Sequence, residues 1–306
     1  MIKLSVIVCT KNRACRLLAC LKTIVNQTLP AEEFEVIVVD NASVDDTRKM
    51  VEVFIGANRT KNIKIVTESA IGHSQARNRG WREACGKYIA YLDDDVVAVP
   101  GWAMMIVDAF ENNETIPSIV GGKIMPLYES KPPEWFLDSY EIRTWGEKKG
   151  FLVENEAKRG FSGANMAVRR ELIEKCGGFS LDFGIVGGTF RAGEDTDLCK
   201  RIYLIDKNFW YDPAMIVYHR TPAAAMSLKN FFVRSFHCGK SAAFTYKKKM
   251  SWAGFFKTWL DFFVKFLFLP FKLIMRGAGY NRIMHALVEG LDDIGFRLGY
   301  LVGRKG

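Results

Sequence analysis

The sequence lacks the patterns that mark several common classes of protein. Its seven cysteines are an odd number, and no two of them stand at the Cys-x-x-Cys spacing of zinc ribbons and redox sites. A disulfide framework is therefore not indicated, and a reducing compartment is the simpler interpretation. The sequence also has no Gly-x-Gly-x-x-Gly and no Gly-x-x-x-x-Gly-Lys-[Ser/Thr] segment, so a dinucleotide-binding or P-loop fold loses its main support.

Long hydrophobic runs are scarce as well. The apolar run that begins at Leu4 is short and stands close to Lys11, which fits the first strand of a domain better than a signal peptide. Between Trp252 and Met275 the longest uncharged stretch is Phe266–Phe271, whereas a membrane-spanning helix needs about 20 mostly apolar residues. We expect neither a signal peptide nor an ordinary transmembrane segment.

Charge and aromatic residues are distributed unevenly along the 306 residues. Residues 229–306 hold 14 of the lysines and arginines but only 4 aspartates and glutamates, so the net charge of +9 resides in this part. The same residues hold 17 of the 39 aromatic side chains. This shift in composition predicts a domain over residues 1–226 and a basic, aromatic helical region over residues 227–306.

The region between Trp252 and Met275 has the pattern of an amphipathic helix. Lys257, Asp261 and Lys265 are spaced four residues apart, which places them along one helix face opposite a broad aromatic face. Such a basic, aromatic helix suits the anionic cytoplasmic surface of a membrane, so we expect a peripheral membrane protein. Packing against the rest of the chain, a dimer face and a re-entrant insertion are alternatives. Nucleic acid is disfavoured as a partner because no recognisable binding module accompanies the charge.

The first hundred residues alternate between short apolar runs and helical patterns. This alternation predicts an α/β fold with a largely parallel sheet, in which ligands gather at the carboxyl ends of the strands. The expected strands are Leu4–Cys9, Phe34–Val39, Ile63–Val66 and Tyr88–Leu92, and the expected helices are Arg16–Asn26, Asp46–Ile55 and Ser74–Cys85. Further strands are expected at Ile119–Met125, Gly160–Val168 and Met215–Tyr218.

Three consecutive carboxylates, Asp93, Asp94 and Asp95, follow the fourth expected strand directly. Like charges side by side repel, so a cation is expected to sit among them. Oxygen ligands of this kind suit Mg²⁺ or Mn²⁺ bound to phosphate oxygens, which indicates nucleotide chemistry. The alternative is that the triplet only ends a strand and caps the next helix.

These features together resemble a family 2 glycosyltransferase of the GT-A fold, over roughly residues 3–220. The resemblance rests on elements that recur in that family in a fixed order. They are Thr10-Lys11-Asn12-Arg13, Val38-Val39-Asp40-Asn41, Ala76-Arg77-Asn78-Arg79-Gly80, Leu92-Asp93-Asp94-Asp95, Phe161-Ser162-Gly163-Ala164-Asn165, Gly177-Gly178-Phe179, Gly193-Glu194-Asp195-Thr196-Asp197 and Ile216-Val217-Tyr218-His219.

The resemblance implies a nucleotide-sugar donor and a divalent metal, Mn²⁺ or Mg²⁺. It places the metal on Asp95, with His219 as a second ligand; a strand-end histidine can equally be a hydrogen-bonded scaffold residue. Asp93 is expected to face the ribose or the metal-bound phosphates, and Asp94 is assigned to the same donor site. The metal would act as a Lewis acid on the departing diphosphate.

Other donor contacts are expected from the loops that follow the strands. Asp40 would accept a hydrogen bond from a base such as uracil, although it could merely stabilise a turn. Thr10, Asn12 and Arg13 would frame the base and phosphates. Arg77 would pair with the pyrophosphate, or be a solvated helix residue.

A glycine-containing turn and an acidic helix start complete the predicted site. The turn that holds Gly163 and Asn165 would allow close backbone approach to the donor sugar. Asp195 is our candidate for the base that takes a proton from the acceptor hydroxyl, with Glu194 positioning the acceptor or the base. Both carboxylates could instead merely complement a helix N-terminus.

The predicted function is that of an inverting glycosyltransferase. It would move a sugar from a nucleotide donor, a UDP-sugar by the argument for Asp40, to a glycan or lipid-linked acceptor in cell-surface polysaccharide synthesis. The alternatives are a nucleotidyltransferase and a non-catalytic glycan- or membrane-binding scaffold of the same fold. The sequence leaves the donor sugar, the linkage and the oligomeric state open.

Overall fold

The computed structural model describes residues 1–59, 61–186, 189–191, 193–245 and 280–303, together with residues 256, 257, 260, 263, 264 and 267. The chain forms two compact units. The first contains Met1–Leu127, Glu141–Gly188 and Gly193–Arg220, and the second contains Tyr128–Tyr140, Thr189–Ala192 and Thr221–Gly306. The second unit thus takes in short stretches of the domain predicted over residues 1–226 as well as the C-terminal region.

A parallel half-sheet opens the first unit. Its strands are β1 (Leu4–Thr10), β2 (Phe34–Asp40), β3 (Ile63–Thr67) and β4 (Tyr88–Asp93), which lie in the order β3-β2-β1-β4. The register pairs Thr10 with Asp40 and Cys9 with Asp93. The parallel strands predicted from the alternating pattern are therefore confirmed, and their polar carboxyl ends meet at one edge of the sheet.

Beyond β4 the sheet continues in the order β8-β6-β11-β5, with β7 paired to β11. β8 runs antiparallel to its neighbours β4 and β6, and β5 and β7 run antiparallel to β11. These strands are β5 (Val96–Ala98), β6 (Ile119–Tyr128), β7 (Gly150–Phe151), β8 (Met166–Arg169) and β11 (Phe209–Thr221). Two further short strands are β9 (Gly184–Val186) and β10 (Thr189–Arg191). The strand predicted at Gly160–Val168 begins six residues later, because residues before Met166 form a turn. The strand predicted at Met215–Tyr218 is much longer.

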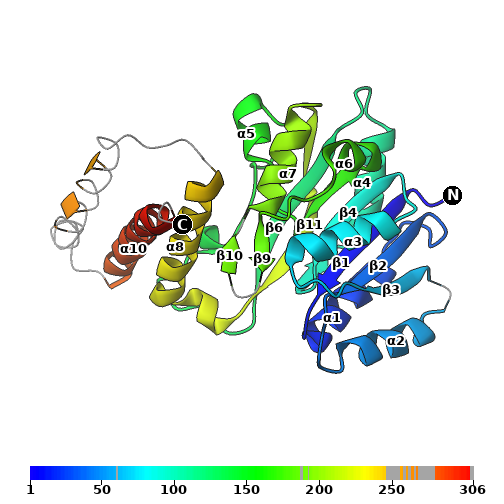
Figure 1. Ribbon diagram of the computed structural model, residues 1–306, viewed down its shortest axis with the longest axis horizontal. Coiled ribbons are helices and arrows are strands. Elements are labelled where there is room, and N and C mark those ends of the chain that lie inside the picture. The colour runs from blue at the N-terminus through cyan, green and yellow to red at the C-terminus, as the bar shows by residue number, and fades with distance from the viewer. Residues whose placement is uncertain are drawn as a thin grey trace. The chain divides into compact units, whose positions relative to one another are not determined.

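Helices cover both faces of this mixed sheet (Figure 1). On one face, α1 (Ala14–Val25), α2 (Thr47–Ala57) and α4 (Trp102–Glu111) pack on alternate strand residues such as Val6 and Val8. On the other face, α3 (His73–Glu83), α6 (Arg170–Cys176) and α7 (Glu194–Tyr203) pack on residues such as Ile7 and Tyr91, and α5 (Glu154–Arg159) packs beside α7. Strand side chains alternate between faces, so a strand buried on both sides is mostly apolar, as β1, β2 and β4 are.

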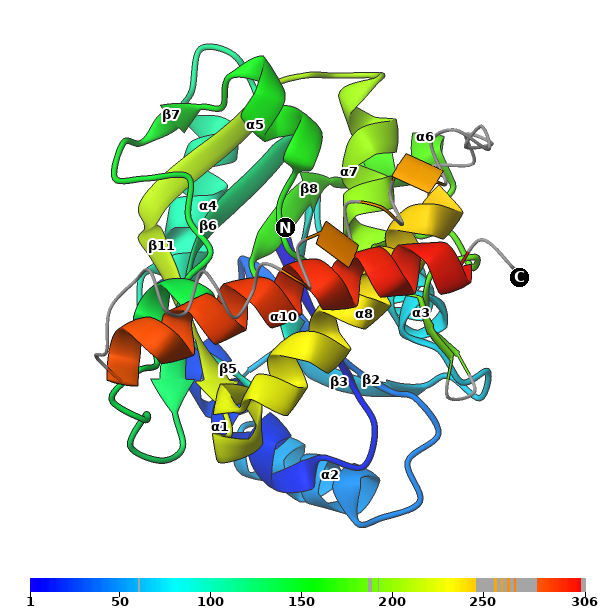
Figure 2. The same cartoon turned by 90° about the vertical axis from the view of Figure 1, so that its left-hand side faces the viewer.

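The second unit is built on two helices that pack closely. Its elements are the short 3-10 helices η1 (Asp138–Tyr140) and η2 (Ala223–Met226) and the helices α8 (Leu228–Thr245) and α10 (Tyr280–Gly303). In both views α8 and α10 lie side by side (Figure 2). A Cβ atom at Gly299 would lie 1.8 Å from the carbonyl oxygen of Phe236, so only glycine permits this approach.

Aromatic side chains form a separate core in the second unit. Trp135 and Phe136 pack with Phe231 of α8 and Val288 of α10. The helix predicted between Trp252 and Met275 lies mostly outside the described residues. Among the helices that the structure describes, none combines the length and the apolar character needed to cross a membrane.

Candidate active site

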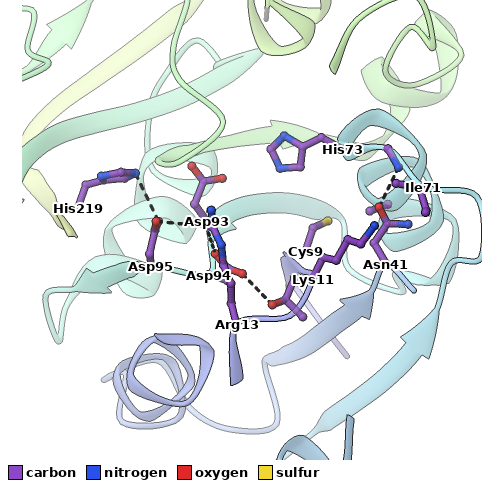
Figure 3. Close-up of a pocket in the computed structure, with 13 residues that line it drawn as sticks. Cys9, Lys11, Arg13, Asn41, Ile71, His73, Asp93, Asp94, Asp95 and His219 are labelled. Atoms are coloured by element: carbon purple, nitrogen blue, oxygen red, sulfur yellow. Dashed lines mark hydrogen bonds and ion pairs between the residues drawn. The ribbon is translucent and has the colours of Figure 1, made fainter. Parts of the chain in front are cut away.

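A cavity of about 720 Å³ lies at the carboxyl ends of β1, β2 and β4 in the first unit (Figure 3). Polar side chains from three strand ends and from the start of α3 surround it. Its lining residues are Cys9, Thr10, Lys11, Arg13, Asn41, Ile71, Gly72, His73, Ala76, Asp93, Asp94, Asp95 and His219. This is the edge of the sheet at which the strand pattern predicts a ligand.

Two carboxylates and one imidazole converge in this cavity. Asp93 ends β4, Asp95 follows in the turn to β5, and the antiparallel pairing of β11 with β5 sets His219 opposite Val96. One potential ligand atom from each of Asp93, Asp95 and His219 lies within 4.8 Å of the others. The Nε2 atom of His219 is 3.4 Å from Oδ1 of Asp95. Residues more than a hundred positions apart thus share one site.

The chemistry of this trio fits a divalent cation. Within the described part of the chain, the buried Oδ1 atom of Asp95 accepts no hydrogen bond, which is costly for a buried carboxylate oxygen without a cation. Carboxylate ligands suit Mn²⁺ and Mg²⁺, and an imidazole nitrogen is a common ligand of transition metals. Asp93, Asp95 and His219 would hold the ion, which would supply Lewis-acid compensation for phosphate charge.

Asp94 is tied to the loop after β1. Its Oδ2 atom accepts a hydrogen bond of 2.7 Å from Thr10 Oγ1, and its Oδ1 atom is 3.0 Å from Arg13 Nη1. Burial raises the pKa of Asp94 above its ordinary value, although the Arg13 charge and the Thr10 bond oppose that rise. Asp94 therefore anchors Thr10 and Arg13 at the cavity wall. Its predicted contact with the donor stays a prediction.

The remaining loop residues hold one another in place. Asn12 has a positive φ of 55° and accepts the Val44 N–H on its Oδ1 atom at 2.8 Å. Asp40 is buried, and its Oδ1 atom accepts the Ser43 N–H at 3.0 Å, which is the turn role given above as the alternative. These bonds fix the loops beside the cavity, and the predicted contacts of Asn12 and Asp40 with a nucleotide remain predictions.

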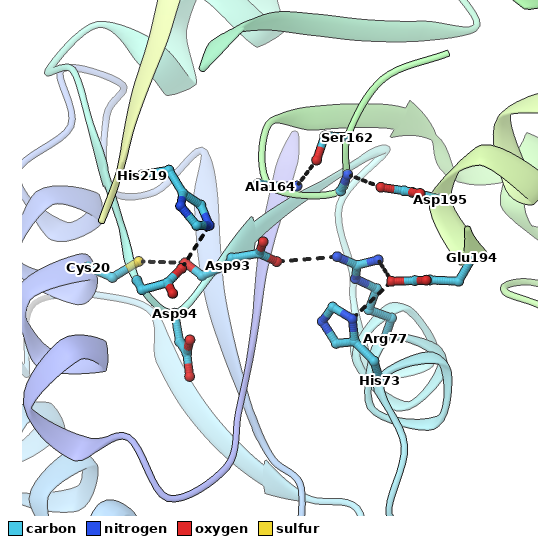
Figure 4. A network of polar contacts seen from close by, with 12 residues as sticks. Cys20, His73, Arg77, Asp93, Asp94, Ser162, Ala164, Glu194, Asp195 and His219 are labelled. Carbon is cyan, nitrogen blue, oxygen red and sulfur yellow. Dashed lines mark hydrogen bonds and ion pairs between the residues drawn. The ribbon is translucent and has the colours of Figure 1, made fainter. Parts of the chain in front are cut away.

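Arg77 lies in the interior and bridges two carboxylates (Figure 4). Its side chain is 4% exposed, with Nη2 3.3 Å from Asp93 Oδ1 and Nη1 3.2 Å from Glu194 Oε1. The guanidinium group also packs over the ring of Phe179. The structure thus places Arg77 behind the cavity wall, where it connects Asp93 to the acidic start of α7, and the solvated-helix alternative is wrong.

The two carboxylates at the start of α7 have different surroundings. Glu194 is buried, and its Oε1 atom is 3.0 Å from His73 Nδ1 as well as in contact with Arg77. Burial alone would raise the pKa of Glu194, but the His73 hydrogen bond and the Arg77 charge outweigh it and lower that pKa to about 2. Glu194 is therefore ionised throughout the neutral range.

Asp195 faces the turn that contains Gly163. Its Oδ2 atom accepts the Gly163 N–H at 2.9 Å, and its Oδ1 atom accepts the Thr196 N–H at 2.7 Å. A Cβ atom at Gly163 would lie 2.3 Å from Arg77 Nη2, so a side chain at this position would displace the Arg77 guanidinium group. Arg77, Gly163 and Asp195 thus form one compact arrangement.

Asn165 has a structural position. Its Nδ2 group donates to the carbonyl oxygens of Lys123 and Met215, and its Oδ1 atom accepts the Trp102 indole N–H. Because both amide protons are used and the residue is 1% exposed, its side chain has no proton left to donate to a sugar. The Asn165 side chain therefore makes no donor contact through its amide protons, and the backbone approach predicted for its turn stays a prediction.

Seven of the cavity residues were not among the candidates from the sequence, and three of these carry ionisable side chains: Cys9, Lys11 and His73. Lys11 stands between Thr10 and Asn12 in the first motif of the family resemblance, so the sequence already indicated a place for it near the site. Burial raises the pKa of the Cys9 thiol to about 12, which leaves it protonated. Nothing local marks His73, because its partner Glu194 is far away in sequence.

Known proteins are similar to this chain in sequence and in fold. A glucosyl-dolichyl phosphate glucuronosyltransferase of Haloferax volcanii is 30% identical over 132 residues, which are 43% of this chain and 42% of that protein. The chain spans about half the length of the curated relatives it matches.

Solved structures extend the similarity to the whole fold. The mannosyltransferase PcManGT from Pyrobaculum calidifontis, in complex with GDP-Man and Mn²⁺, aligns with a TM-score of 0.64 at 18% identity, over 99% of this chain and 86% of that one. S. aureus TarS 1-349 in complex with UDP aligns with a TM-score of 0.59 at 16% identity, over 100% and 92%. The predicted GT-A fold is confirmed. Since the model of glycosyl transferase family 2 matches residues 5–177, the chain belongs to that family.

Proposed function

We propose that this protein is an inverting glycosyltransferase that moves a sugar from a nucleoside diphosphate sugar to the hydroxyl group of a glycan or lipid-linked acceptor. The observation that carries the proposal is the convergence of Asp93, Asp95 and His219 in a cavity at the carboxyl ends of parallel strands. The ion that they would hold and the cavity volume together suit a diphosphate-linked substrate.

The donor end of the site rests on the loops after β1 and β2. Arg13 is held by Asp94 and half-exposed, so its guanidinium group can also meet a phosphate oxygen. Asp40 is the candidate for the base contact, which favours a UDP-sugar by the argument from its carboxylate. Because the structural neighbours bind GDP-Man in one case and UDP in the other, both nucleotides belong in the experiment.

The transfer step is assigned to Asp195. An acceptor hydroxyl attacks the anomeric carbon, its proton passes to the Asp195 carboxylate, and the bond from that carbon to the diphosphate oxygen breaks. A single displacement of this kind inverts the anomeric configuration. The Gly163 and Thr196 N–H groups hold the carboxylate in one orientation before the reaction.

A lipid-linked acceptor is supported by the name of the Haloferax relative and by the C-terminal region. Five exposed apolar side chains there are spaced so that a helix would carry them within about a third of its circumference. They are Phe256 (65% exposed), Leu260 (64%), Phe263 (52%), Val264 (42%) and Leu267 (70%). We call them the apolar stripe. Residues 229–306 also carry more basic than acidic side chains. The stripe and this positive charge together suit the cytoplasmic surface of an anionic membrane and a role in cell-surface polysaccharide synthesis.

The two alternatives make different demands on the same residues. A nucleotidyltransferase would use the metal trio but has no need of Asp195 as a base. A non-catalytic scaffold would bind a glycan or membrane without turnover. Membership of the family favours the glycosyltransferase, and so does the presence of a carboxylate on each side of Arg77, namely Asp93 and Glu194.

The proposal is tested by the release of nucleoside diphosphate from a panel of UDP- and GDP-sugars, with Mn²⁺, with Mg²⁺ and with EDTA. We expect metal-dependent hydrolysis or transfer with one donor, lost in Asp95→Ala and kept in Asp108→Ala. Asp108 is an exposed aspartate of α4 outside the cavity lining and is a matched control. Release of pyrophosphate from a nucleoside triphosphate and a sugar phosphate would favour the nucleotidyltransferase instead. No reaction with any donor, and no binding of UDP or GDP, would favour the scaffold.

A further inference from the structure

The oxygens of Glu194 are all engaged by the protein. Oε1 lies at hydrogen-bond distance from both His73 Nδ1 and Arg77 Nη1, and Oε2 accepts the Gly193 N–H at 3.1 Å. Because Oε1 is in a buried ion pair with Arg77, a proton transferred to Glu194 would leave that cation without one of its partners, and the low pKa of Glu194 also opposes the role of base. Its remaining function is to orient the groups that contact it.

His73 is the contacted group that reaches the cavity. It is the first residue of α3, its side chain is 31% exposed, and it lines the cavity together with Lys11. Glu194 of α7 holds the Nδ1 atom of the ring. The other ring nitrogen, Nε2, therefore points away from α7. Within the described residues no other hydrogen bond to the ring is present. Figure 3 shows the ring directed toward the part of the cavity that contains Asp93.

The surroundings of this nitrogen favour an anion. Gly72, the N-cap residue of α3, has no side chain, and among the described residues no side chain caps the first turn of this helix. Gly72, His73 and Ala76 all line the cavity, so the positive end of this 11-residue helix and the imidazole face the same space. Asp93, Asp95 and His219 lie across that space. The negative charge of a group bound in between would be compensated by the metal on one side and by His73 and the helix start on the other.

We propose that Nε2 of His73 contacts the diphosphate group of the donor, and that Glu194 is the positioning residue that orients the ring. The proposal rests on the proposed function, since it assigns a part of the nucleotide-sugar donor to a residue of the same cavity. His73 is a binding residue that makes this contact, and Glu194 acts through it. The His73 ring forms no covalent bond in this role.

The experiment separates the two ring nitrogens. Asn carries its amide nitrogen on the γ carbon, as Nδ1 is carried, whereas Gln carries its amide nitrogen one atom further, as Nε2 is carried. Calorimetric titration with UDP and with GDP in the presence of Mn²⁺ identifies the nucleotide that wild type binds. For that nucleotide we expect His73→Asn to weaken binding roughly tenfold to a hundredfold, the loss of one hydrogen bond to a charged group. His73→Gln should recover part of the loss.

Three comparisons complete the test. The affinity for the corresponding nucleoside, measured by NMR titration, should be the same in wild type and His73→Asn, because the contact is with the diphosphate. Glu194→Gln should weaken nucleoside diphosphate binding in the same direction, and the double variant should bind no more weakly than His73→Asn alone. Arg79→Gln, on an outer face of the same helix and outside the cavity lining, should bind as wild type does.

The contrary results are distinct. Equal nucleoside diphosphate affinities for wild type and both folded His73 variants, with melting temperatures matched, would overturn this inference and leave the proposed function standing. Equal losses for nucleoside and nucleoside diphosphate would show that His73 contacts the base or ribose, and would also overturn it. Absence of UDP and GDP binding in wild type would overturn the proposed function together with the inference.

Discussion

Replacement of Arg77 by methionine is the most informative change to the stability of the first unit. Methionine keeps the length and the apolar character of the stem but removes the guanidinium group. Asp93 and Glu194 would then lose the cation that lies 3.3 Å and 3.2 Å from them. The packing over the Phe179 ring would largely persist.

The expected cost follows from the burial of the bridge. Arg77 is 4% exposed and Glu194 is 12% exposed at the side chain, so little water can replace the lost charge. Removal of one partner from a buried ion pair typically costs about 3–5 kcal/mol, because the other charge is left uncompensated. A loss of this size is a large fraction of the roughly 5–15 kcal/mol that stabilises a typical domain.

The assay is urea unfolding at pH 7 followed by tryptophan fluorescence. Arg79→Met is the matched control, because Arg79 lies two residues away on the same helix and pairs with Glu83 at 2.8 Å on the exposed side. Its side chain is 44% exposed, so we expect a loss below about 1 kcal/mol. The double variant Arg77→Met with Glu194→Gln should regain part of the loss, because one unpaired charge is removed with its partner.

A loss for Arg77→Met no larger than that for Arg79→Met would contradict a stabilising role of the buried bridge. Such a result, combined with a large fall in UDP or GDP affinity, would restore the pyrophosphate contact predicted for Arg77 from the sequence. If the bridge is structural, the Arg77→Lys variant should recover part of the stability, since lysine restores the charge without the two-pronged geometry.

Three further predictions concern the base, the pH dependence and the membrane. Asp195→Asn should bind UDP or GDP as wild type does and lower transfer by about a hundredfold to ten-thousandfold; near-normal turnover would remove Asp195 from the base role. The pKa of Glu194 is lowered from 4.5 to about 2, so its contribution is fully present above pH 4.5 and is lost as the pH falls toward 2. The advantage of wild type over Glu194→Gln in urea unfolding should therefore shrink by about 3 kcal/mol over that interval, and a constant difference would contradict the assignment. Replacing Leu260 and Phe263 by serine should lower co-sedimentation with phosphatidylglycerol vesicles by tenfold or more, whereas Val53→Ser, an exposed apolar residue of α2, should not; equal losses would argue against the apolar stripe as the contact.

Substitution within the apolar stripe tests membrane contact better than deletion of the C-terminal region does. Residues beyond Met226 include Phe231 and Val288, which pack on Trp135 and Phe136. Removal of the C-terminal region would uncover those rings and cause aggregation that could be mistaken for membrane binding. Substitution of exposed residues leaves that core intact.

The carboxyl-end site could be predicted from the sequence because it depends on local patterns. Each of β1, β2 and β4 is a short apolar run that ends in a polar residue, and parallel strands bring such ends to one edge. The convergence of Asp93 and Asp95 follows from this rule. The approach of His219 depends on the antiparallel register of β11 against β5, and that register leaves no local signature in the sequence.

The residues that were misplaced or missed have partners distant in sequence. Arg77 has the pattern of a polar helix residue, and only the contact with Glu194, 117 positions away, makes it interior. Asn165 is engaged by Trp102 and by two backbone carbonyl groups on separate strands. His73 is likewise oriented by Glu194. Burial and pairing at these positions are properties of the tertiary fold, which local propensity cannot supply.

The metal dependence of nucleotide binding is the decisive measurement for the site formed by Asp93, Asp95 and His219. Calorimetric titration with UDP and GDP should show binding to wild type in Mn²⁺ that weakens by tenfold or more in EDTA. Asp95→Asn should bind in Mn²⁺ only as weakly as wild type binds in EDTA, and Asp108→Asn should match wild type in both conditions. Binding of either nucleotide to Asp95→Asn with unchanged affinity and unchanged metal dependence would contradict a metal centre formed by Asp93, Asp95 and His219.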